Sequence, residues 1–291
     1  MSSSEPTASR FCVLHDSDTD MGTLMLRRRW SPALERDVFE MTLDGKLMMS
    51  SAVAVSEQAL ARHALALLPD RPLRVLIGGL GFGFTALAVL ADARVGELTI
   101  IERLGPVIAW HRSGLLPWSG ELTADPRAKI VEGDFFAAVA GDVTAHRGTV
   151  PIFAAQRAFL PNDPPFPLRT RDCPLRVERR KLPTPPHERL PGDVAPGARY
   201  DAILIDIDDS PSLLWHDRHA AFYEPRSLAA LHRNLQPGGV LALWCATHPG
   251  EPFIKTVKTV FATVLLVEVP FENPCVRQPV TDYLVLATAR A

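Results

Sequence analysis

Two spacings of apolar residues divide the chain into a strand-rich beginning and a longer part in which strands and helices alternate. Three short runs near the N-terminus favour strands: Phe11–His15, Gly22–Leu26 and Val38–Leu43. The last run stops at Asp44-Gly45, a dipeptide typical of a tight hairpin turn. We therefore expect a small N-terminal β unit, residues 1–55.

The part from residue 56 to residue 291 has the pattern of an α/β domain. Helices are predicted at 56–68, with Ser56 as a candidate N-cap, at 84–91, from about 106, at 228–235 and at 253–261. The turn Gln236–Gly239 is expected just before the fifth strand. Seven strands are predicted, at 74–77, 97–101, 128–131, 202–205, 240–244, 264–269 and 283–287. Strands that alternate with helices predict a parallel sheet covered on both faces.

Residues 141–199 interrupt this alternation. The segment holds 11 of the 26 prolines, and its 10 Lys or Arg residues outnumber its 6 Asp or Glu residues. Proline removes a backbone donor and fixes φ, so the segment cannot supply a regular helix or a central strand. We interpret it as a basic, irregular insertion in the α/β domain. A solvated loop is the simpler interpretation, and a lid or a partner-binding element is the alternative.

Composition narrows the class of protein. With 291 residues and 47% hydrophobic content, the chain can bury a full core. No apolar run reaches the roughly 18 to 20 residues that cross a bilayer, and the N-terminus lacks a secretory pattern, so we expect a soluble, cytoplasmic protein. The four cysteines form no CxxC pair, and we predict no structural metal site. A net charge of −2 gives no reason to expect nucleic acid or a membrane as partner.

A glycine-rich loop is the first candidate for chemistry. The glycines Gly78, Gly79, Gly81 and Gly83 stand between a predicted strand and a predicted helix, where backbone amides can approach a ligand. A tight turn without a ligand is the alternative. Two acids follow at the ends of the next two strands. Glu102 can accept hydrogen bonds from two ribose hydroxyls, and Asp134 can accept one from an adenine amino group.

The fourth strand ends in a second group of acids, Asp206, Asp208 and Asp209. Ligands of open α/β sheets bind at the carboxyl ends of the strands, so these acids are expected in the same crevice as the glycine loop. They can hold a cationic amine, take its proton and face a sulfonium. A hard metal ion and a simple helix N-terminal acid cluster are the competing interpretations.

Several motifs together resemble the spermidine synthases, which have the class I methyltransferase fold. They are Gly78–Gly83, Ile101-Glu102, Leu116–Gly120, Asp125–Arg127, Gly133-Asp134, Tyr200–Asp206 and Gln236–Gly239, with Leu43–Gly45 in the β unit. The resemblance implies a Rossmann-like seven-stranded sheet and a donor that is either S-adenosylmethionine or its decarboxylated form. It also implies alkyl transfer to a small-molecule acceptor, usually an amine, and a homodimer. Glu102 then resembles the ribose ligand, Asp134 the adenine ligand, Asp206 the acid beside the reacting amine and Asp209 the second acid of the DxxD motif.

Two departures from the family pattern affect the substrates. The family's glycine loop usually carries an acid where this chain has Gly81, so ordinary S-adenosylmethionine would not be repelled and the loop amides would be free to meet its carboxylate. The family helix that reads YxExxxH corresponds here to Ser56-Glu-Gln58 followed by Arg62, so we expect that its amine-facing acid is absent and that Arg62 would repel a diamine if it faced the pocket. The alternatives are a true aminopropyltransferase with a reshaped amine pocket and a noncatalytic adenosyl-binding or interaction module that uses the insertion 141–199 to contact a partner.

Overall fold

The computed structural model describes residues 11–140, 198–274 and 278–290, and these residues fall into two compact units. One unit comprises residues 11–52, and the other comprises the described residues from Val53 onward. Nearly all of the predicted insertion lies outside the described residues, and so does Cys173.

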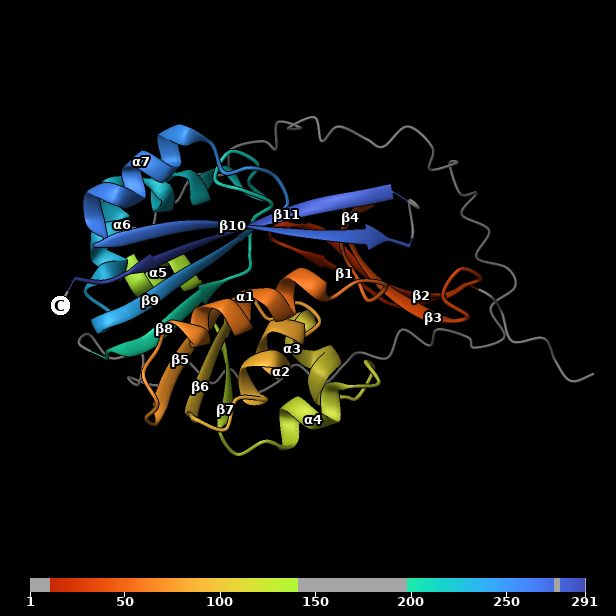
Figure 1. Ribbon diagram of the computed structural model, residues 1–291. Helices are drawn as coiled ribbons and strands as arrows, with labels where there is room; N and C mark the ends of the chain where they lie inside the picture. Colours follow the sequence, from red (N-terminus) through yellow and green to blue (C-terminus); the bar gives the residue numbers. More distant parts are fainter. Residues whose placement is uncertain (1–10, 141–197, 275–277, 291) are drawn as a thin grey trace, which may run out of the picture. The chain divides into compact units, whose positions relative to one another are not determined.

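The first unit is a four-stranded antiparallel sheet. Its strands are β1 (Phe11–Thr19), β2 (Gly22–Ser31), β3 (Arg36–Leu43) and β4 (Lys46–Ser50), in that order (Figure 1). Both turn residues between β3 and β4, Asp44 and Gly45, have positive φ, which confirms the predicted hairpin turn. Strand β4 was not among the strands predicted from the sequence. Glu40 is buried and accepts hydrogen bonds from Arg27 and Arg29, which compensates the burial of its charge.

The second unit is built on the predicted seven-stranded sheet. The strand order is β10 (Thr263–Asn273), β11 (Gln278–Thr288), β9 (Leu235–Cys245), β8 (Tyr200–Ile205), β5 (Leu73–Gly78), β6 (Val95–Glu102) and β7 (Ala128–Glu132) (Figure 1). The five strands from β9 to β7 are parallel, as expected. The sheet is nevertheless mixed, because β11 runs antiparallel to both β9 and β10. β10 and β11 follow each other in the chain and pair antiparallel as a hairpin.

Helices cover the two faces of this sheet (Figure 1). One face carries α1 (Val55–Ala66), α2 (Phe84–Leu90), α3 (Gly105–Arg112) and α4 (Ser119–Ala124). The other carries α5 (Phe135–Ala140), α6 (Pro225–His232), α7 (Glu251–Val260) and the 3-10 helix η1 (Asp217–Tyr223). Inward-facing residues of β8, β9 and β11 are fully buried against α6 and α7, and they form much of the core.

Three local predictions are corrected. Ser56 is not an N-cap, because α1 begins at Val55 and the Ser56 hydroxyl bonds to the Glu57 carboxylate. Helix α6 begins at Pro225, which suits a first helical position, and ends before Leu235. Gln236–Gly239 lies inside β9, where the pairing with β8 jumps from Leu235 to Val240.

Candidate functional site

The strand order places the candidate site. From β5 the chain continues through β6 and β7 on one side, then returns to β8 on the other side of β5. The strand order therefore reverses between β5 and β8, and ligands of doubly wound sheets bind at the carboxyl ends of the strands at such a point. The glycine loop follows β5, Glu102 ends β6 and Asp206 follows β8. The glycine loop, Glu102 and Asp206 therefore lie at the strand ends that the sequence predicted for them.

The glycine loop lies directly against the end of β8. Gly79 has a φ of 92°, and a Cβ atom at this position would lie 2.3 Å from the backbone oxygen of Asp206. A side chain therefore cannot be accommodated without moving the backbone. Gly83 has a φ of 81° and precedes α2. Gly78 and Gly81 complete the loop, and Gly81 also has positive φ. The close packing against Asp206 therefore requires glycine at position 79 whether or not a ligand binds.

Side chains of α3 and α4 hold the loop from its other side. His111 bonds through Nε2 to the Gly81 carbonyl at 3.0 Å and through Nδ1 to the Ser119 hydroxyl at 3.2 Å. Burial lowers the pKa of His111, so the ring is neutral, with its proton on the nitrogen that faces the carbonyl. The indole of Trp118 donates to the Phe82 carbonyl at 2.6 Å. The Leu116–Gly120 motif thus fixes the backbone of the glycine loop.

Glu102 is buried at the end of β6 and braces the same loop. Its two carboxylate oxygens accept hydrogen bonds from the amides of Leu80, at 2.8 Å, and Leu104, at 2.7 Å. Burial raises the pKa of Glu102, and backbone hydrogen bonds, including one from Gly81, act against this. The expectation that the loop amides are free to meet a ligand carboxylate is therefore wrong for Leu80 and Gly81. Each carboxylate oxygen has a second lone pair that could accept from a ligand hydroxyl.

Asp134 is half-buried and already has two partners. Its Oδ2 atom lies 2.8 Å from Nη1 of Arg103, and its Oδ1 atom accepts a hydrogen bond from the Ala137 amide at 3.2 Å. The second contact is that of an N-cap, and Asp134 begins α5 in this way. Sequence reasoning did not single out Arg103, which follows Glu102 directly. A planar guanidinium beside the expected adenine position can stack on an aromatic ring.

Asp206 directly follows β8 and lies against the glycine loop. Its Oδ2 atom accepts a hydrogen bond from the Thr85 hydroxyl at 2.8 Å, which ties the end of β8 to the first turn of α2. Burial raises the pKa of Asp206 to about 6; the Thr85 hydrogen bond lowers it, and the charge of Asp282 raises it. A carboxyl with this pKa is mostly ionised at neutral pH and can still accept a proton readily.

Two further carboxylates interact electrostatically with Asp206, and sequence reasoning missed both. Glu57 of α1 is buried, and its pKa is raised to about 8 by burial and then by the charge of Asp206. Asp282 of β11 is buried, accepts a hydrogen bond from the Trp244 indole at 3.2 Å, and has its pKa raised by burial. We call Glu57, Asp206 and Asp282 the acid cluster. The expectation that α1 contributes no acid is wrong. The available signal was that Glu57 lies on the same face of the predicted helix as apolar residues such as Leu60, and this face is buried.

The two other acids after β8 have different surroundings. The buried carboxylate of Asp208 accepts hydrogen bonds from the Trp215 amide, the His219 ring and the Tyr223 hydroxyl. It therefore anchors the loop and η1, and the expectation that it joins the crevice is wrong. Asp209 is buried, and its charge contributes to the raised pKa of Asp282. Of the three acids after β8, Asp206 therefore belongs to the acid cluster, and Asp209 interacts electrostatically with its member Asp282.

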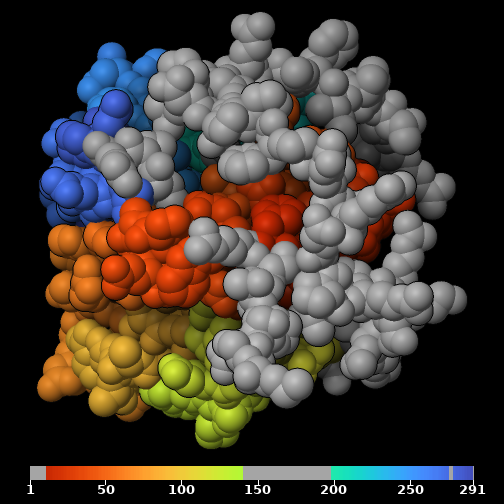
Figure 2. Space-filling view, turned by 90° about the vertical axis from the view of Figure 1, so that its right-hand side faces the viewer, coloured from red at the N-terminus to blue at the C-terminus, as the bar shows by residue number. Residues whose placement is uncertain are grey.

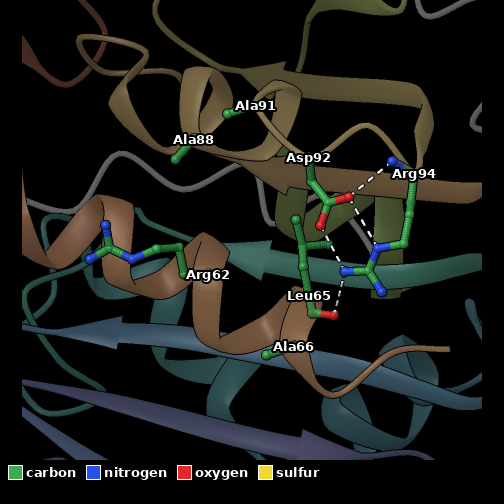
Figure 3. A pocket seen from close by; sticks show the side chains of 7 residues that line it. All are labelled: Arg62, Leu65, Ala66, Ala88, Ala91, Asp92 and Arg94. Carbon is green, nitrogen blue, oxygen red and sulfur yellow. Dashed lines mark hydrogen bonds and ion pairs between the residues drawn. The ribbon is translucent and has the colours of Figure 1, made fainter. Parts of the chain in front are cut away.

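Arg62 lies in a different place from the acid cluster. It lines a groove of about 340 Å³ between α1 and α2, with Leu65, Ala66, Ala88, Ala91, Asp92 and Arg94 (Figure 3). In this groove Arg94 bonds to the Asp92 carboxylate and to backbone carbonyls at the end of α1, including that of Leu65. Arg62 therefore lines the groove between α1 and α2. The expectation that Arg62 would repel a diamine depended on its facing the amine pocket, and this condition is not met.

No group of three or more His, Cys, Asp or Glu residues within 11–140, 198–274 and 278–290 is arranged to hold a metal ion. In the same described ranges, no helix is long and apolar enough to cross a membrane.

Comparison with solved structures identifies the fold. A spermidine synthase in complex with the transition-state analogue AdoDATO matches with a TM-score of 0.62 and 18% identity, over 95% of this chain and 73% of the other. The chain has the spermidine synthase fold. The spermidine synthase of Thermotoga maritima matches with a TM-score of 0.60 and 19% identity, over 95% and 72% of the two chains. A probable spermidine synthase of Corynebacterium glutamicum matches with a TM-score of 0.54 and 13% identity, over 98% and 81%.

The class I methyltransferases have the same fold. The expected resemblance to spermidine synthases and the expected methyltransferase-like sheet are therefore both confirmed. No protein-family model matches the chain, and no curated protein matches it in sequence. The structural matches establish the spermidine synthase fold. At sequence identities of 13% to 19% they do not assign a substrate.

Proposed function

We propose that the chain is a transferase that binds an adenosyl sulfonium donor and transfers an alkyl group from it to an amine. The donor is S-adenosylmethionine or its decarboxylated form. The acid cluster beside the glycine loop is the observation that carries the proposal. Buried carboxylates that repel one another are costly unless a cation joins them. A sulfonium and an ammonium are both cations that such a site would hold.

The donor's nucleoside is assigned to the loop side of the crevice. The remaining lone pairs of Glu102 would accept the ribose hydroxyls, and Asp134 would accept the adenine amino group while keeping its ion pair with Arg103. The glycines let the backbone approach the ligand. A structural neighbour was solved with AdoDATO, which supports an adenosyl ligand in this fold.

In the reaction that we propose, the lone pair of the amine nitrogen attacks the carbon attached to the sulfonium sulfur. The carbon–sulfur bond breaks, its electron pair stays on sulfur as a neutral thioether, and the new carbon–nitrogen bond leaves a surplus proton on nitrogen. The carboxylate of Asp206 takes that proton, and Thr85 holds the carboxylate in place. Asp209 supplies further negative charge for the amine. Alignment of donor and acceptor accounts for most of the acceleration.

An aminopropyltransferase with a reshaped amine site is the second candidate. Glu57 favours it, because a buried acid of α1 that interacts with Asp206 can give up its proton and pair with a second ammonium group. Gly81 favours methyl transfer from ordinary S-adenosylmethionine, because the loop carries no acid to repel the donor's carboxylate. The nature of the transferred group therefore has to be decided by product analysis.

The test is incubation of the full chain with each donor and a panel of mono-, di- and triamines, followed by mass spectrometry of the nucleoside product. Methyl transfer leaves S-adenosylhomocysteine, and aminopropyl transfer leaves methylthioadenosine. We expect one of these products to form only when an amine is present, and to be lost in Asp206→Asn. If calorimetry detects no binding of either donor and neither product forms, the proposal is wrong.

A further inference from the structure

One side chain beside the acid cluster, the indole of Trp244, has no role in the proposed reaction. Trp244 stands near the end of β9, the strand between β8 and β11 in the sheet. Just before it, Leu243 pairs with Ile205 of β8, and both residues pack on the core of α6 and α7. Side chains alternate along a strand, so the next residues, Trp244 and Asp206, project from the opposite face of the sheet.

Hydrogen bonds agree with this placement on the face that carries α1 and α2. Asp206 accepts from the Thr85 hydroxyl of α2. The Nε1 atom of Trp244 donates to the Oδ2 atom of Asp282 at 3.2 Å. Asp206 and Asp282 are close enough for the charge of Asp282 to raise the pKa of Asp206. In strand order, Trp244 therefore lies between two members of the acid cluster, Asp206 after β8 and Asp282 on β11.

The ring of Trp244 is half-buried, whereas Glu57 and Asp282 are buried. The hydrogen bond with Asp282 uses the one donor of the indole, so the rest of the ring is an apolar surface with a negative π face. In Figure 2 the blue C-terminal region, which contains β11, reaches the molecular surface. Carboxylates and an aromatic ring are together the groups that hold an alkylated ammonium.

Hydrogen bonds within the protein limit how many N–H groups the acid cluster can accept. Asp206 already accepts from Thr85, and Asp282 already accepts from Trp244. A primary ammonium has three N–H groups, and each one that leaves water without finding an acceptor is costly. In a secondary ammonium an alkyl group replaces one N–H. That alkyl group needs no acceptor and is attracted to an aromatic face.

We propose that Trp244 determines the class of the acceptor: its ring contacts the N-alkyl group of a secondary amine and favours that amine over a primary one. This inference rests on the proposed function, in which the acceptor is an amine. The nitrogen of a secondary amine attacks the carbon attached to the sulfonium sulfur, and the carbon–sulfur electron pair stays on sulfur. The tertiary ammonium that forms carries one proton, which Asp206 takes. A tertiary amine would leave Asp206 no proton to accept and is not the expected acceptor.

Calorimetric titration of the full chain with n-butylamine and with N-methylbutylamine, in the absence of a donor, tests the preference. We expect the wild type to bind N-methylbutylamine about 3- to 30-fold more tightly, the range that a cation–π contact provides. Trp244→Leu keeps an apolar side chain and removes the π face, so the two affinities should become nearly equal. Trp244→Phe keeps an aromatic face and should retain part of the preference.

The matched control is Tyr283→Leu. Tyr283 follows Asp282 on β11, but its ring packs on the core of the opposite face and contacts the ring of His248. This variant exchanges an aromatic residue for leucine without touching the acid cluster, so it should keep the wild-type ratio of affinities.

The wild type alone can overturn the proposal, by binding neither amine or by binding both equally. A Trp244→Leu variant that keeps the wild-type ratio, with its fold verified by circular dichroism, overturns it as well. Amine binding is measured apart from turnover, so the two proposals fail separately. Alkyl transfer without the preference refutes the role of Trp244 alone. The preference without donor binding or product supports the amine site and refutes the transfer.

Discussion

Replacing Glu57 with glutamine tests the acid cluster directly. Glutamine has nearly the shape of a protonated glutamate and cannot ionise. Glu57 is buried, and its pKa is raised to about 8 by burial and then by the charge of Asp206. In the wild type, a rise in pH must therefore create a buried negative charge beside other carboxylates, and in the variant it cannot.

The sign and size of the effect follow from proton linkage. The pKa of Glu57 is higher in the folded state, so the folded chain binds more protons and stability falls as pH rises. The loss begins near the unfolded pKa of 4.5 and is complete above the folded pKa of about 8. That change in pKa corresponds to about 5 kcal/mol, of which about 4 kcal/mol falls between pH 5 and pH 9.

Urea denaturation at pH 5, 7 and 9 measures this difference. We expect the free energy of unfolding of Glu57→Gln, relative to the wild type, to rise by about 4 kcal/mol from pH 5 to pH 9. The matched control is Glu121→Gln, at an exposed position of α4, whose difference from the wild type should vary by no more than about 0.5 kcal/mol. Parallel curves for Glu57→Gln and the wild type would refute the acid cluster.

The remaining predictions concern the donor and the reaction. Glu102→Ala and Asp134→Ala should each weaken donor binding by about 10- to 150-fold, the equivalent of roughly 1.5 to 3 kcal/mol, measured by calorimetry. Asp134→Ala should also cost about 1 kcal/mol of stability, because it removes the N-cap of α5; unchanged affinity in both folded variants would contradict the adenosyl assignment. Asp206→Asn should retain the donor and lose about 10²- to 10⁴-fold in turnover, so full activity would exclude it as the base. Gly81→Asp should shift donor preference toward the decarboxylated form, since like charges 4 Å apart at an effective dielectric near 20 repel by about 4 kcal/mol. A strong wild-type preference for the decarboxylated donor in side-by-side titrations would favour aminopropyl transfer instead.

The sequence by itself determined the seven strands, the glycine loop and the hairpin turn at Asp44-Gly45. These features depend on local properties: the period of apolar residues, the short apolar runs of buried strands, and the backbone freedom of glycine. The end of each strand also follows from the local pattern. For this reason Glu102 and Asp206 could be assigned to the crevice before the fold was known, together with the glycines that follow β5.

Only the tertiary structure decided which acids meet. Glu57, Asp206 and Asp282 come from α1, the end of β8 and β11, and no local pattern connects them. Their approach depends on the strand order, which places β11 beside β9 and α1 across β8, β9 and β11. Asp208 shows the converse. It is two residues from Asp206, yet its carboxylate is held by Trp215 of the following loop and by His219 and Tyr223 of η1, because a buried charge needs hydrogen-bond partners.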